Sequence, residues 1–334
     1  MDFSRYENLR TLVRANFSEQ TRALVDEALV YADGKLTGLC RYDGTPLLDH
    51  AVAVAMVVIS EVGLGRNSTV SAILHDVVRL AHKRLPAEEF LALTADIRDR
   101  FGEQVVGITM GLANISELRL KVAKEQADNF RDLLVSYSED PRVILIKLAD
   151  RLEVMRSLEM FPREKWRKKS WESMNLYAQI AHKLGLYSLK SELEDIALKY
   201  LEPKDYEHIV TKLEESAEER KAFIGRFLVP IEQRLNRLGI KYHIKSRTKS
   251  IFSIWNKMHK QNVPFEGVYD IFAIRIIIDC DKEQEKQQCW TAYSIVTDFY
   301  TPNPNRMRDW ISIPKSNGYE SLHTTVSAGG RWVE

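Results

Sequence analysis

Apolar residues recur at three- and four-residue spacing from residue 19 to about residue 238, with polar positions between them. This spacing places the apolar side chains on one face of a helix, so it predicts a long run of amphipathic helices. Clear examples are LLDHAVAVAMVVISEVG, VSAILHDVVRLAHKRL and PRVILIKLADRLEVMRSLEMF. The helical segments are separated by glycine or proline at Gly44, Pro86, Pro141, Pro162 and Gly185.

The pattern changes after Gly239. IKYHIKS alternates like a strand, IFSIWNKMHKQ has helical spacing, and YDIFAIRIIIDC is nearly continuously apolar, like a buried strand. SLHTTVSA and RWVE also read as strands. An all-helical part followed by a mixed sheet with helices is an α+β fold. We expect a helical domain over residues 1–195, connecting helices over 196–238 and an α/β domain over 239–334.

Composition limits the classes of function. A chain of 334 residues with 45% hydrophobic content is long enough for about two domains with real cores. Its 48 basic and 47 acidic residues give no overall attraction to DNA or to an anionic membrane, so neither is an expected partner. No apolar stretch approaches the roughly 20 residues of a membrane span, and we expect a cytoplasmic protein.

The cysteines add no chemistry to this picture. Cys40, Cys280 and Cys289 are odd in number and lack CxxC spacing. This argues against a disulfide framework and against a thiolate metal cluster.

His50, the adjacent pair His75 and Asp76, and Asp150 lie on predicted helices among apolar residues. Buried polar side chains need partners, and two imidazoles with two carboxylates from three helices suit a divalent ion such as Mn²⁺, Fe²⁺ or Zn²⁺. A His-Asp pair alone is a weak signal, because a buried histidine more often satisfies its hydrogen bonds within the core.

A second group of candidates follows the first predicted strand of the α/β part. In SRTKSIFSIWNKM, the side chains of Arg247, Lys249, Ser253 and Lys257 fall on a strand-to-helix turn and the first helical turns. A helix N-terminus with cations beside it suits a polyphosphate, although a basic helix face is more often just solvated surface.

Asp270 opens the most apolar strand, where a lone carboxylate is costly unless it is paired or holds a cation. Mg²⁺ bound to a triphosphate would suit this position. In a regular strand, Arg275 projects from the face opposite to Asp270.

Several of these segments resemble a known family. RYDGTPLLDH, AILHDVV, QADNFRDLL and VILIKLADRL stand in the order and approximate spacing of the hydrolase domain of the RelA/SpoT family. YDIFAIRIII, RMRDWISIPKSNGYESLHTTV and the final VE resemble its (p)ppGpp synthetase domain. Over residues 20–334 the chain thus resembles the catalytic half of a long alarmone enzyme, with an HD-type helical domain before a nucleotidyltransferase-like domain.

The resemblance implies roles for the candidate residues. In the helical domain, His50, His75, Asp76 and Asp150 would hold Mn²⁺, and Arg41 would lie beside a guanosine nucleotide. In the second domain, Asp270 and Glu334 would hold Mg²⁺, with Glu334 also taking the proton from the ribose 3′-hydroxyl. Those implied to bind ATP are Arg247, Lys249, Ser253, Lys257 and Arg275. Those implied to bind GDP or GTP are Arg308, Lys315, Asn317, Tyr319 and His323.

Ordinary interpretations of the second set exist. Tyr319 is an aromatic that could simply pack, His323 a strand histidine, and residues 316–318 a turn. In the family, Tyr319 would stack on guanine. The implied reaction transfers pyrophosphate from ATP to the 3′-hydroxyl of GDP or GTP and releases AMP, mainly through positioning and charge neutralisation.

The helical domain departs from the family pattern around its metal ligands. Arg79 and Leu80 stand where active hydrolases have Glu-Asp, Glu153 and Val154 replace a His-Asn pair, and residues 110–114 replace an acidic segment. Neither a guanidinium nor an isobutyl group accepts a proton from water. We therefore expect this domain to bind metal or nucleotide while hydrolysing poorly.

Other interpretations of the departures stay open. Arg79 could pair with a phosphate in a variant hydrolase, Glu153 could supply the missing carboxylate, or the metal could be structural. The stretch from Arg306 to Asp309 resembles the basic form that this segment has in bifunctional members of the family, whereas synthetase-only members have an acidic form. This resemblance favours a retained hydrolase activity.

Three functions therefore compete. The leading hypothesis is a GTP/GDP pyrophosphokinase with a degenerate hydrolase domain. The alternatives are a Mn²⁺-dependent (p)ppGpp 3′-pyrophosphohydrolase and a non-catalytic guanosine-nucleotide sensor. Family members continue past the equivalent of Glu334 with another strand and, in long forms, with regulatory domains that meet the ribosome. We accordingly expect a truncated synthetase domain that becomes more active when extended by about 50 residues.

Overall fold

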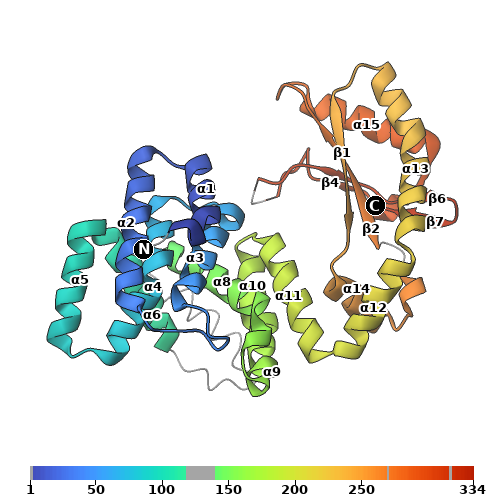
Figure 1. The fold of residues 1–334 in the computed structure, drawn as a ribbon. Helices are drawn as coiled ribbons and strands as arrows, with labels where there is room; N and C mark the ends of the chain where they lie inside the picture. Colours follow the sequence, from blue (N-terminus) through green and yellow to red (C-terminus); the bar gives the residue numbers. More distant parts are fainter. Residues whose placement is uncertain (1–2, 118–139, 269–270, 316–317) are drawn as a thin grey trace. The chain divides into compact units, whose positions relative to one another are not determined.

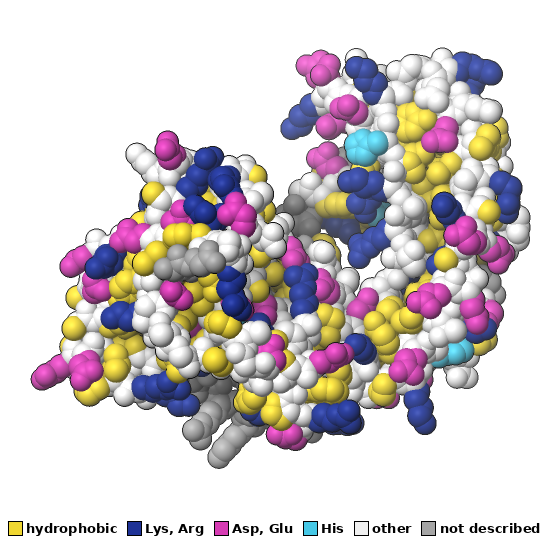
Figure 2. Space-filling view, in the orientation of Figure 1, with side chains coloured by type: hydrophobic (Ala, Val, Ile, Leu, Met, Phe, Trp, Pro, Cys, Tyr) yellow, Lys and Arg dark blue, Asp and Glu magenta, His cyan; other side chains and the backbone are white. Residues whose placement is uncertain are grey.

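The computed structural model describes residues 3–117, 140–268, 271–315 and 318–334 (Figure 1). It divides into two compact units, Met1–Leu201 and Glu202–Glu334, coloured blue to green and yellow to red in Figure 1. Each unit is described below by itself. Acidic and basic side chains are interspersed over the face shown in Figure 2, in keeping with the near-neutral composition.

Apart from an isolated β-bridge between Cys40 and Pro46, the regular elements in the described residues of the first unit are helices. Its elements are η1 (Phe3–Tyr6), α1 (Glu7–Asn16), α2 (Glu19–Leu36), α3 (Leu47–Val57), η2 (Val58–Val62), α4 (Arg66–Arg84), α5 (Ala87–Phe101), α6 (Glu103–Glu117), α8 (Pro141–Arg156), η4 (Leu158–Met160), α9 (Arg163–Glu172), η5 (Ser173–Tyr177), α10 (Ala178–Lys183) and α11 (Tyr187–Leu201).

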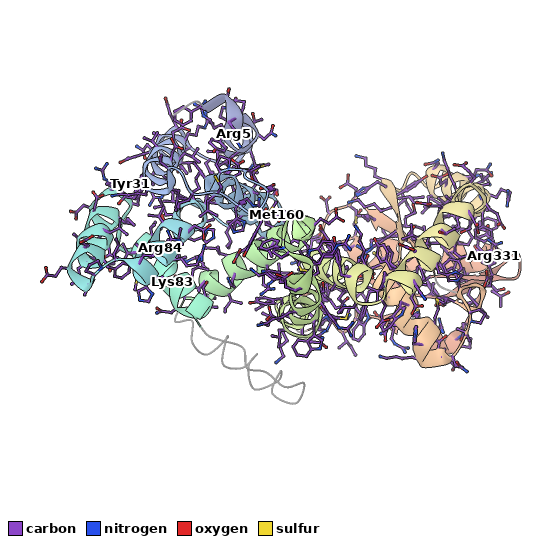
Figure 3. The ribbon with its side chains drawn as sticks, turned by 60° about the horizontal axis from the view of Figure 1, so that its bottom comes forward. Arg5, Tyr31, Lys83, Arg84, Met160 and Arg331 are labelled. Atoms are coloured by element: carbon purple, nitrogen blue, oxygen red, sulfur yellow. The ribbon has the colours of Figure 1, made fainter. Side chains whose placement is uncertain are left out.

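Helix α4 is the centre of this unit. Its residues from Ser68 to Val78 are all buried, and it packs against α2, α3, α5 and α6. A helix that is buried on every side needs small or apolar residues all round, and the VSAILHDVV segment supplies them. His75 and Asp76 are therefore held in the core. The basic last turn, which includes Lys83 and Arg84 (Figure 3), suits the negative end of the helix dipole.

Helix α8 carries the other polar side chains of the core. Its start is fixed by Asp140, whose side chain accepts a hydrogen bond from the amide of Arg142, and by Pro141 in the first turn. Both are standard helix-start signals. The helix packs against α3, α6 and α11, so its inner face meets α3 directly.

The second unit combines helices with short strands. Its elements are α12 (Pro203–Glu215), α13 (Ala217–Arg237), β1 (Tyr242–Thr248), α14 (Ile251–Gln261), η6 (Phe265–Gly267), β2 (Phe272–Ile278), α15 (Glu285–Phe299), β3 (Thr301–Pro302), η7 (Pro304–Arg306), β4 (Arg308–Asp309), β5 (Leu322–His323), β6 (Val326–Ala328) and β7 (Arg331–Val333).

The strands pair in antiparallel fashion throughout the described residues. β1 pairs with β2, β6 lies between β3 and β7, and β4 pairs with β5. The amide of Ile274 in β2 donates to the carbonyl of Glu334, 2.8 Å away, so the last residue lies beside β2. Arg331 in β7, labelled in Figure 3, forms an ion pair with Glu219 of α13.

The core of this unit lies between α13, α15 and the strands. Phe227, Ile231 and Leu235 of α13 are buried together with Phe272 of β2 and Val326 of β6. Helices α12 and α14 share a smaller cluster around Ile209 and Ile254. Residues 196–238, expected as a connector, thus include the end of α11 in the first unit and two helices with buried positions in the second.

The predicted α+β class is confirmed by this architecture. The prediction of a mixed sheet differs from the described ladders, which are antiparallel. The near-continuous apolar run of β2 suggested burial on both faces, but Arg275 is exposed and only Phe272 is buried. The expected helix at QADNFRDLL lies outside the described residues. In the described part of the chain, no helix is long and apolar enough to span a membrane.

Candidate functional site

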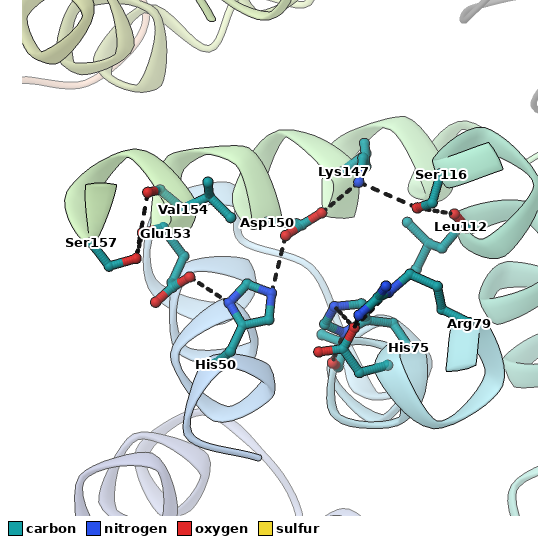
Figure 4. A network of polar contacts seen from close by, with 12 residues as sticks. His50, His75, Arg79, Leu112, Ser116, Lys147, Asp150, Glu153, Val154 and Ser157 are labelled. Atoms are coloured by element: carbon teal, nitrogen blue, oxygen red, sulfur yellow. Dashed lines mark hydrogen bonds and ion pairs between the residues drawn. The ribbon is translucent and has the colours of Figure 1, made fainter. Parts of the chain in front are cut away.

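Three helices of the first unit bring the predicted metal ligands together (Figure 4). His50 lies on α3, His75 and Asp76 on α4, and Asp150 on α8. The ligand atoms of His50, His75 and Asp76 all lie within 4.8 Å of one another. The fourth residue, Asp150, places Oδ1 3.1 Å from His50 Nε2. The structure therefore brings these four predicted residues close together.

The cluster has the properties of a cation site. Oδ2 of Asp76 is buried and lacks a hydrogen-bond partner among the described residues. A buried carboxylate oxygen without a donor is costly, and a bound cation would remove that cost. Imidazole nitrogens with carboxylate oxygens are a donor set for Mn²⁺, Fe²⁺ or Zn²⁺. The donor set thus fits a divalent metal.

His75 is oriented by its own helix. Its Nδ1 lies 2.6 Å from the carbonyl oxygen of Ala72, which can only accept a hydrogen bond. This contact places the proton on Nδ1 and leaves Nε2 for the cluster. Burial lowers the pKa of His75, which favours the neutral ring that binds metal.

Arg79 and Leu80 lie in different surroundings. Arg79 Nε is 2.8 Å from Oδ1 of Asp76, so the guanidinium contacts the cluster directly. Leu80 instead lines a cavity of about 570 Å³ between α2, α4 and α5, together with Val77 and Leu93. The cluster therefore gains a permanent cation at position 79, while Leu80 lines a separate cavity.

Glu153 extends the cluster along α8. Its Oε2 contacts Nδ1 of His50, and its Oε1 lies 2.8 Å from Nη2 of Arg41. The same nitrogen of Arg41 donates to Ser157 Oγ at 2.7 Å. Arg41, predicted to lie beside a nucleotide, is thus joined to the metal-ligand cluster through a single carboxylate.

The charges of the cluster compensate one another. Burial disfavours the charged form of His50, but hydrogen bonds with Asp150 and Glu153 outweigh burial and raise its pKa to about 10. Burial also opposes ionisation of Asp150, yet Lys147 and His50 hold the pKa of this carboxyl well below its usual range. Lys147 Nζ lies 2.6 Å from Asp150 Oδ2 (Figure 4).

In the second unit, four predicted residues lie close together. Lys249 Nζ is 3.8 Å from Oε2 of Glu334, and His323 Nδ1 is 3.6 Å from Oε1 of the same carboxylate. Tyr319 Oη and His323 Nε2 are 2.9 Å apart. These residues come from the β1–α14 turn, from β5, from the loop before it and from the end of β7. The sheet is what joins them, because Glu334 lies beside β2.

The two predicted arginines share one face of the β1–β2 ladder. Arg247 pairs with Ala273 and Lys245 with Arg275, and residues that pair across a ladder point to the same side. Both arginines are exposed, whereas the apolar residues of the other face pack on the core of the unit. The fold therefore presents a basic strand face.

The remaining candidates are distributed around this cluster. Ser253 and Lys257 lie on α14, whose first turn is capped by Ser250 through the amide of Ser253. Lys315 Nζ lies 5.2 Å from the ring centre of Tyr319. Arg308, in β4, donates to the carbonyl of Met307 at 2.9 Å. Asp270 and Asn317 lie outside the described residues.

Sequence reasoning missed two contributors. Lys147 contacts Asp150 from one turn earlier on α8, a three-residue spacing that could have revealed it. Lys165 of α9 hydrogen-bonds Tyr42, the neighbour of Arg41 in sequence, and lies 4.6 Å from its ring centre. Nothing in the sequence pattern connects positions 42 and 165, because their contact depends on how α9 folds back.

A helical unit with a buried His/His-Asp cluster is the arrangement of an HD domain, here followed by a second unit of helices and strands. The model of the HD domain matches residues 28–187. The model described as the region found in RelA/SpoT proteins matches residues 246–334. The chain belongs to the RelA/SpoT family, with an N-terminal HD region followed by the region that defines the family.

Curated relatives carry names for two activities. The chain is 36% identical over 312 residues to a guanosine-3′,5′-bis(diphosphate) 3′-pyrophosphohydrolase of Aquifex aeolicus, covering 93% of this chain and 42% of the relative. It is 33% identical to the bifunctional (p)ppGpp synthase/hydrolase SpoT of Escherichia coli, covering 96% and 44%. It is 33% identical to a GTP pyrophosphokinase of Myxococcus xanthus, covering 91% and 39%. The chain spans less than half the length of these relatives.

Proposed function

We propose that the chain carries the synthetase activity of the family, transferring pyrophosphate from ATP to the 3′-hydroxyl of GDP or GTP. The products would be (p)ppGpp and AMP. The observation that carries this proposal is the grouping of Lys249, His323 and Tyr319 around the carboxylate of Glu334. A lysine, a carboxylate and an aromatic ring beside a basic strand face are the groups that this reaction needs.

The donor nucleotide would lie on the basic strand face. Arg247 and Arg275 would flank the adenine, since a guanidinium plane stacks well on an aromatic base. Lys249, Ser253 and Lys257 would hold the ATP phosphates. Their place at the turn into α14 adds the backbone amides of a helix N-terminus, which favour anionic oxygens.

The acceptor nucleotide would bind at the loop that carries Tyr319. This ring would stack on the guanine, while its hydroxyl contact with His323 fixes the orientation of the ring. Polar contacts to the same nucleotide would come from Arg308, Lys315, Asn317 and His323.

Glu334 would act as the general base for the attacking 3′-hydroxyl. Its carboxylate, about two-fifths exposed, lies within 4 Å of Lys249 Nζ and His323 Nδ1, and so stands among the other residues proposed to meet the two nucleotides. Glu334 and Asp270 would hold Mg²⁺, which neutralises charge on the triphosphate. Positioning of the two nucleotides would supply most of the remaining acceleration.

The test is a chromatographic assay of AMP and ppGpp formed from ATP and GDP with Mg²⁺. We expect turnover by the wild type and a loss of about 100-fold or more in Lys249→Ala, because a phosphate contact and the partner of Glu334 disappear together. Lys260→Ala, in the exposed last turn of α14, is the matched control. No AMP from the wild type, or full activity in Lys249→Ala, would overturn the proposal.

A Mn²⁺-dependent (p)ppGpp 3′-pyrophosphohydrolase is the second candidate. This candidate is favoured by the grouping of His50, His75, Asp76 and Asp150. Binding of Mn²⁺ by these four residues would favour it further. Against it, Arg79 stands beside the ligands and cannot accept a proton from water. Release of pyrophosphate from ppGpp under Mn²⁺ would support hydrolysis. Tight binding of ppGpp with neither reaction would support the third candidate, a nucleotide sensor.

A further inference from the structure

Glu153 lies between His50, which is expected to bind a metal, and Arg41, which is expected to lie beside a nucleotide. One carboxylate oxygen contacts His50 Nδ1, and the other lies 2.8 Å from Nη2 of Arg41. The Glu153 residue is only 6% exposed, so both contacts form away from bulk solvent. A buried carboxylate with two specific partners is held in one orientation, and it fixes those partners in turn.

The two ring nitrogens of His50 face different groups. Nδ1 faces Glu153, whereas Nε2 faces Asp150 at 3.1 Å and points into the cluster of metal ligands (Figure 4). A histidine binds metal through one nitrogen, and the acceptor at the other nitrogen decides which tautomer is present. A carboxylate at Nδ1 keeps a proton there, so Nε2 is the nitrogen that gives up its proton when a cation binds.

We propose that Glu153 is the positioning residue of the HD metal centre, holding His50 in its Nδ1–H tautomer with Nε2 toward the metal. Arg41 fixes the other oxygen of Glu153, so the orientation of His50 depends on a chain of two buried contacts. The proposal rests on the metal-ligand assignment made above for the HD unit. It does not depend on either catalytic activity.

This role differs from the alternative in which Glu153 activates water. Both of its carboxylate oxygens are engaged, one by an imidazole and one by a guanidinium. A general base needs an oxygen directed at the substrate water. Glu153 therefore acts through His50 and is not a catalytic residue in this arrangement.

The first test measures metal affinity. The metal-stripped chain is titrated with Mn²⁺ by calorimetry as wild type, Glu153→Gln and Glu153→Leu. Loss of a carboxylate behind a metal-bound histidine typically weakens affinity by about 10- to 100-fold, which we expect for Glu153→Leu. Glu153→Gln keeps an oxygen acceptor for Nδ1–H, so we expect a smaller loss. Glu159→Gln, whose carboxylate contacts Lys199 and Tyr200, is the matched control and keeps wild-type affinity.

The second test reads the tautomer directly and needs no variant at position 153. In ¹⁵N-histidine-labelled wild type loaded with diamagnetic Zn²⁺, we expect His50 to carry its proton on Nδ1. The signal is assigned by its loss in His50→Asn. A proton on Nε2 with Nδ1 bound to metal would overturn the proposal even if Glu153→Leu fails to fold.

The outcomes separate this inference from the assignment beneath it. If the wild type binds neither Mn²⁺ nor Zn²⁺, the metal-ligand assignment fails and the inference fails with it. If the wild type binds Mn²⁺ and a folded Glu153→Leu binds it equally well, the ligand assignment stands and the role of Glu153 is disproved.

Discussion

Arg79 holds Oδ1 of Asp76 from one turn further along α4, with Nε at 2.8 Å and Nη2 at 2.5 Å. The other oxygen of Asp76 is buried and has no partner among the described residues. Residues three apart on a helix share a face, so this contact follows from the position of Arg79. The arginine thus places a permanent positive charge beside a candidate cation site.

The first prediction concerns this charge. Arg79→Ala removes the repulsion between the guanidinium and a bound divalent cation, so we expect roughly tenfold tighter Mn²⁺ binding. This estimate allows for solvent screening of the partly exposed side chain. Calorimetric titration measures the affinity, with Arg84→Ala at the end of the same helix as the control. Unchanged or weaker Mn²⁺ binding in Arg79→Ala would argue against a metal at Asp76.

Arg79→Ala should also lower the thermal stability of the metal-free protein, although it strengthens Mn²⁺ binding. Without metal, Arg79→Ala leaves the buried Asp76 carboxylate short of its closest cation, and we expect a lower thermal midpoint than in the wild type. Added Mn²⁺ should then raise the midpoint more in the variant than in the wild type, because binding to the native state stabilises it. An equal rise in both proteins would contradict this expectation.

The departures from the hydrolase pattern lead to the second prediction. Arg79→Glu combined with Val154→Asn restores a proton acceptor and a nucleotide contact near the His/Asp cluster. General acid–base catalysis contributes about 10²- to 10⁴-fold, so we expect pyrophosphate release from ppGpp under Mn²⁺ to rise by about 100-fold. The comparison protein carries Val154→Asn alone. Rapid hydrolysis by the wild type would show that the departures do not disable the site.

The third prediction uses the cap of α8. Hydrogen bonds from the Arg142 side chain hold the pKa of Asp140 below its ordinary value of 3.8. The charge of Asp140 therefore contributes stability above the unfolded pKa, and that contribution is lost as pH falls through the lower native pKa. Asp140→Asn keeps a good capping residue but removes the charge.

We accordingly expect the wild type to be more stable than Asp140→Asn at pH 7, with the difference shrinking below about pH 4. Urea unfolding at pH 7, 5, 4 and 3 measures it. In an Arg142→Leu background, the difference between aspartate and asparagine should be small at every pH. A gap that persists at pH 3 would mean that the charge of Asp140 is not its source.

Much of the fold could be predicted from local signals. IFSIWNKMHKQ coincides with α14, and IKYHIKS with most of β1, because each has one clear period. The grouping of His50, His75 and Asp76 also followed from polar residues on apolar helices. The antiparallel pairing of β2 with β1 could not be predicted in this way. Its direction depends on where the chain returns after α14, and an apolar run alone does not specify a partner strand.

Contacts between segments that are distant in sequence limit how much of the site the sequence can predict. The pairing of Glu153 with both His50 and Arg41 spans more than 100 residues, and only the packing of α8 on α3 reveals it. The sequence alone presents Glu153 as a replacement for a histidine that could also supply a missing carboxylate. In three dimensions it is a buried carboxylate that contacts both His50 and Arg41.

The last prediction separates a stacking role of Tyr319 from simple packing. Tyr319→Phe keeps the ring and loses only the hydroxyl contact with His323, 2.9 Å away, whereas Tyr319→Ala loses both. If the ring stacks on guanine, we expect the KM for GDP to rise at least tenfold in Tyr319→Ala, as base–aromatic stacking contributes about 1–3 kcal/mol. In Tyr319→Phe, the KM should change by less than about threefold.

Steady-state assays with GDP varied at saturating ATP, and with ATP varied at saturating GDP, provide the measurement, and thermal melts of each variant provide the control. The ring of Tyr319 has Lys315 5.2 Å from its centre, so truncation also removes a surface contact. A packing aromatic would lower the thermal midpoint in Tyr319→Ala and leave the KM for GDP unchanged. A rise in the KM for ATP instead of GDP would place the ring at the donor nucleotide, because only the bound nucleotide that stacks on it loses affinity when the ring is removed.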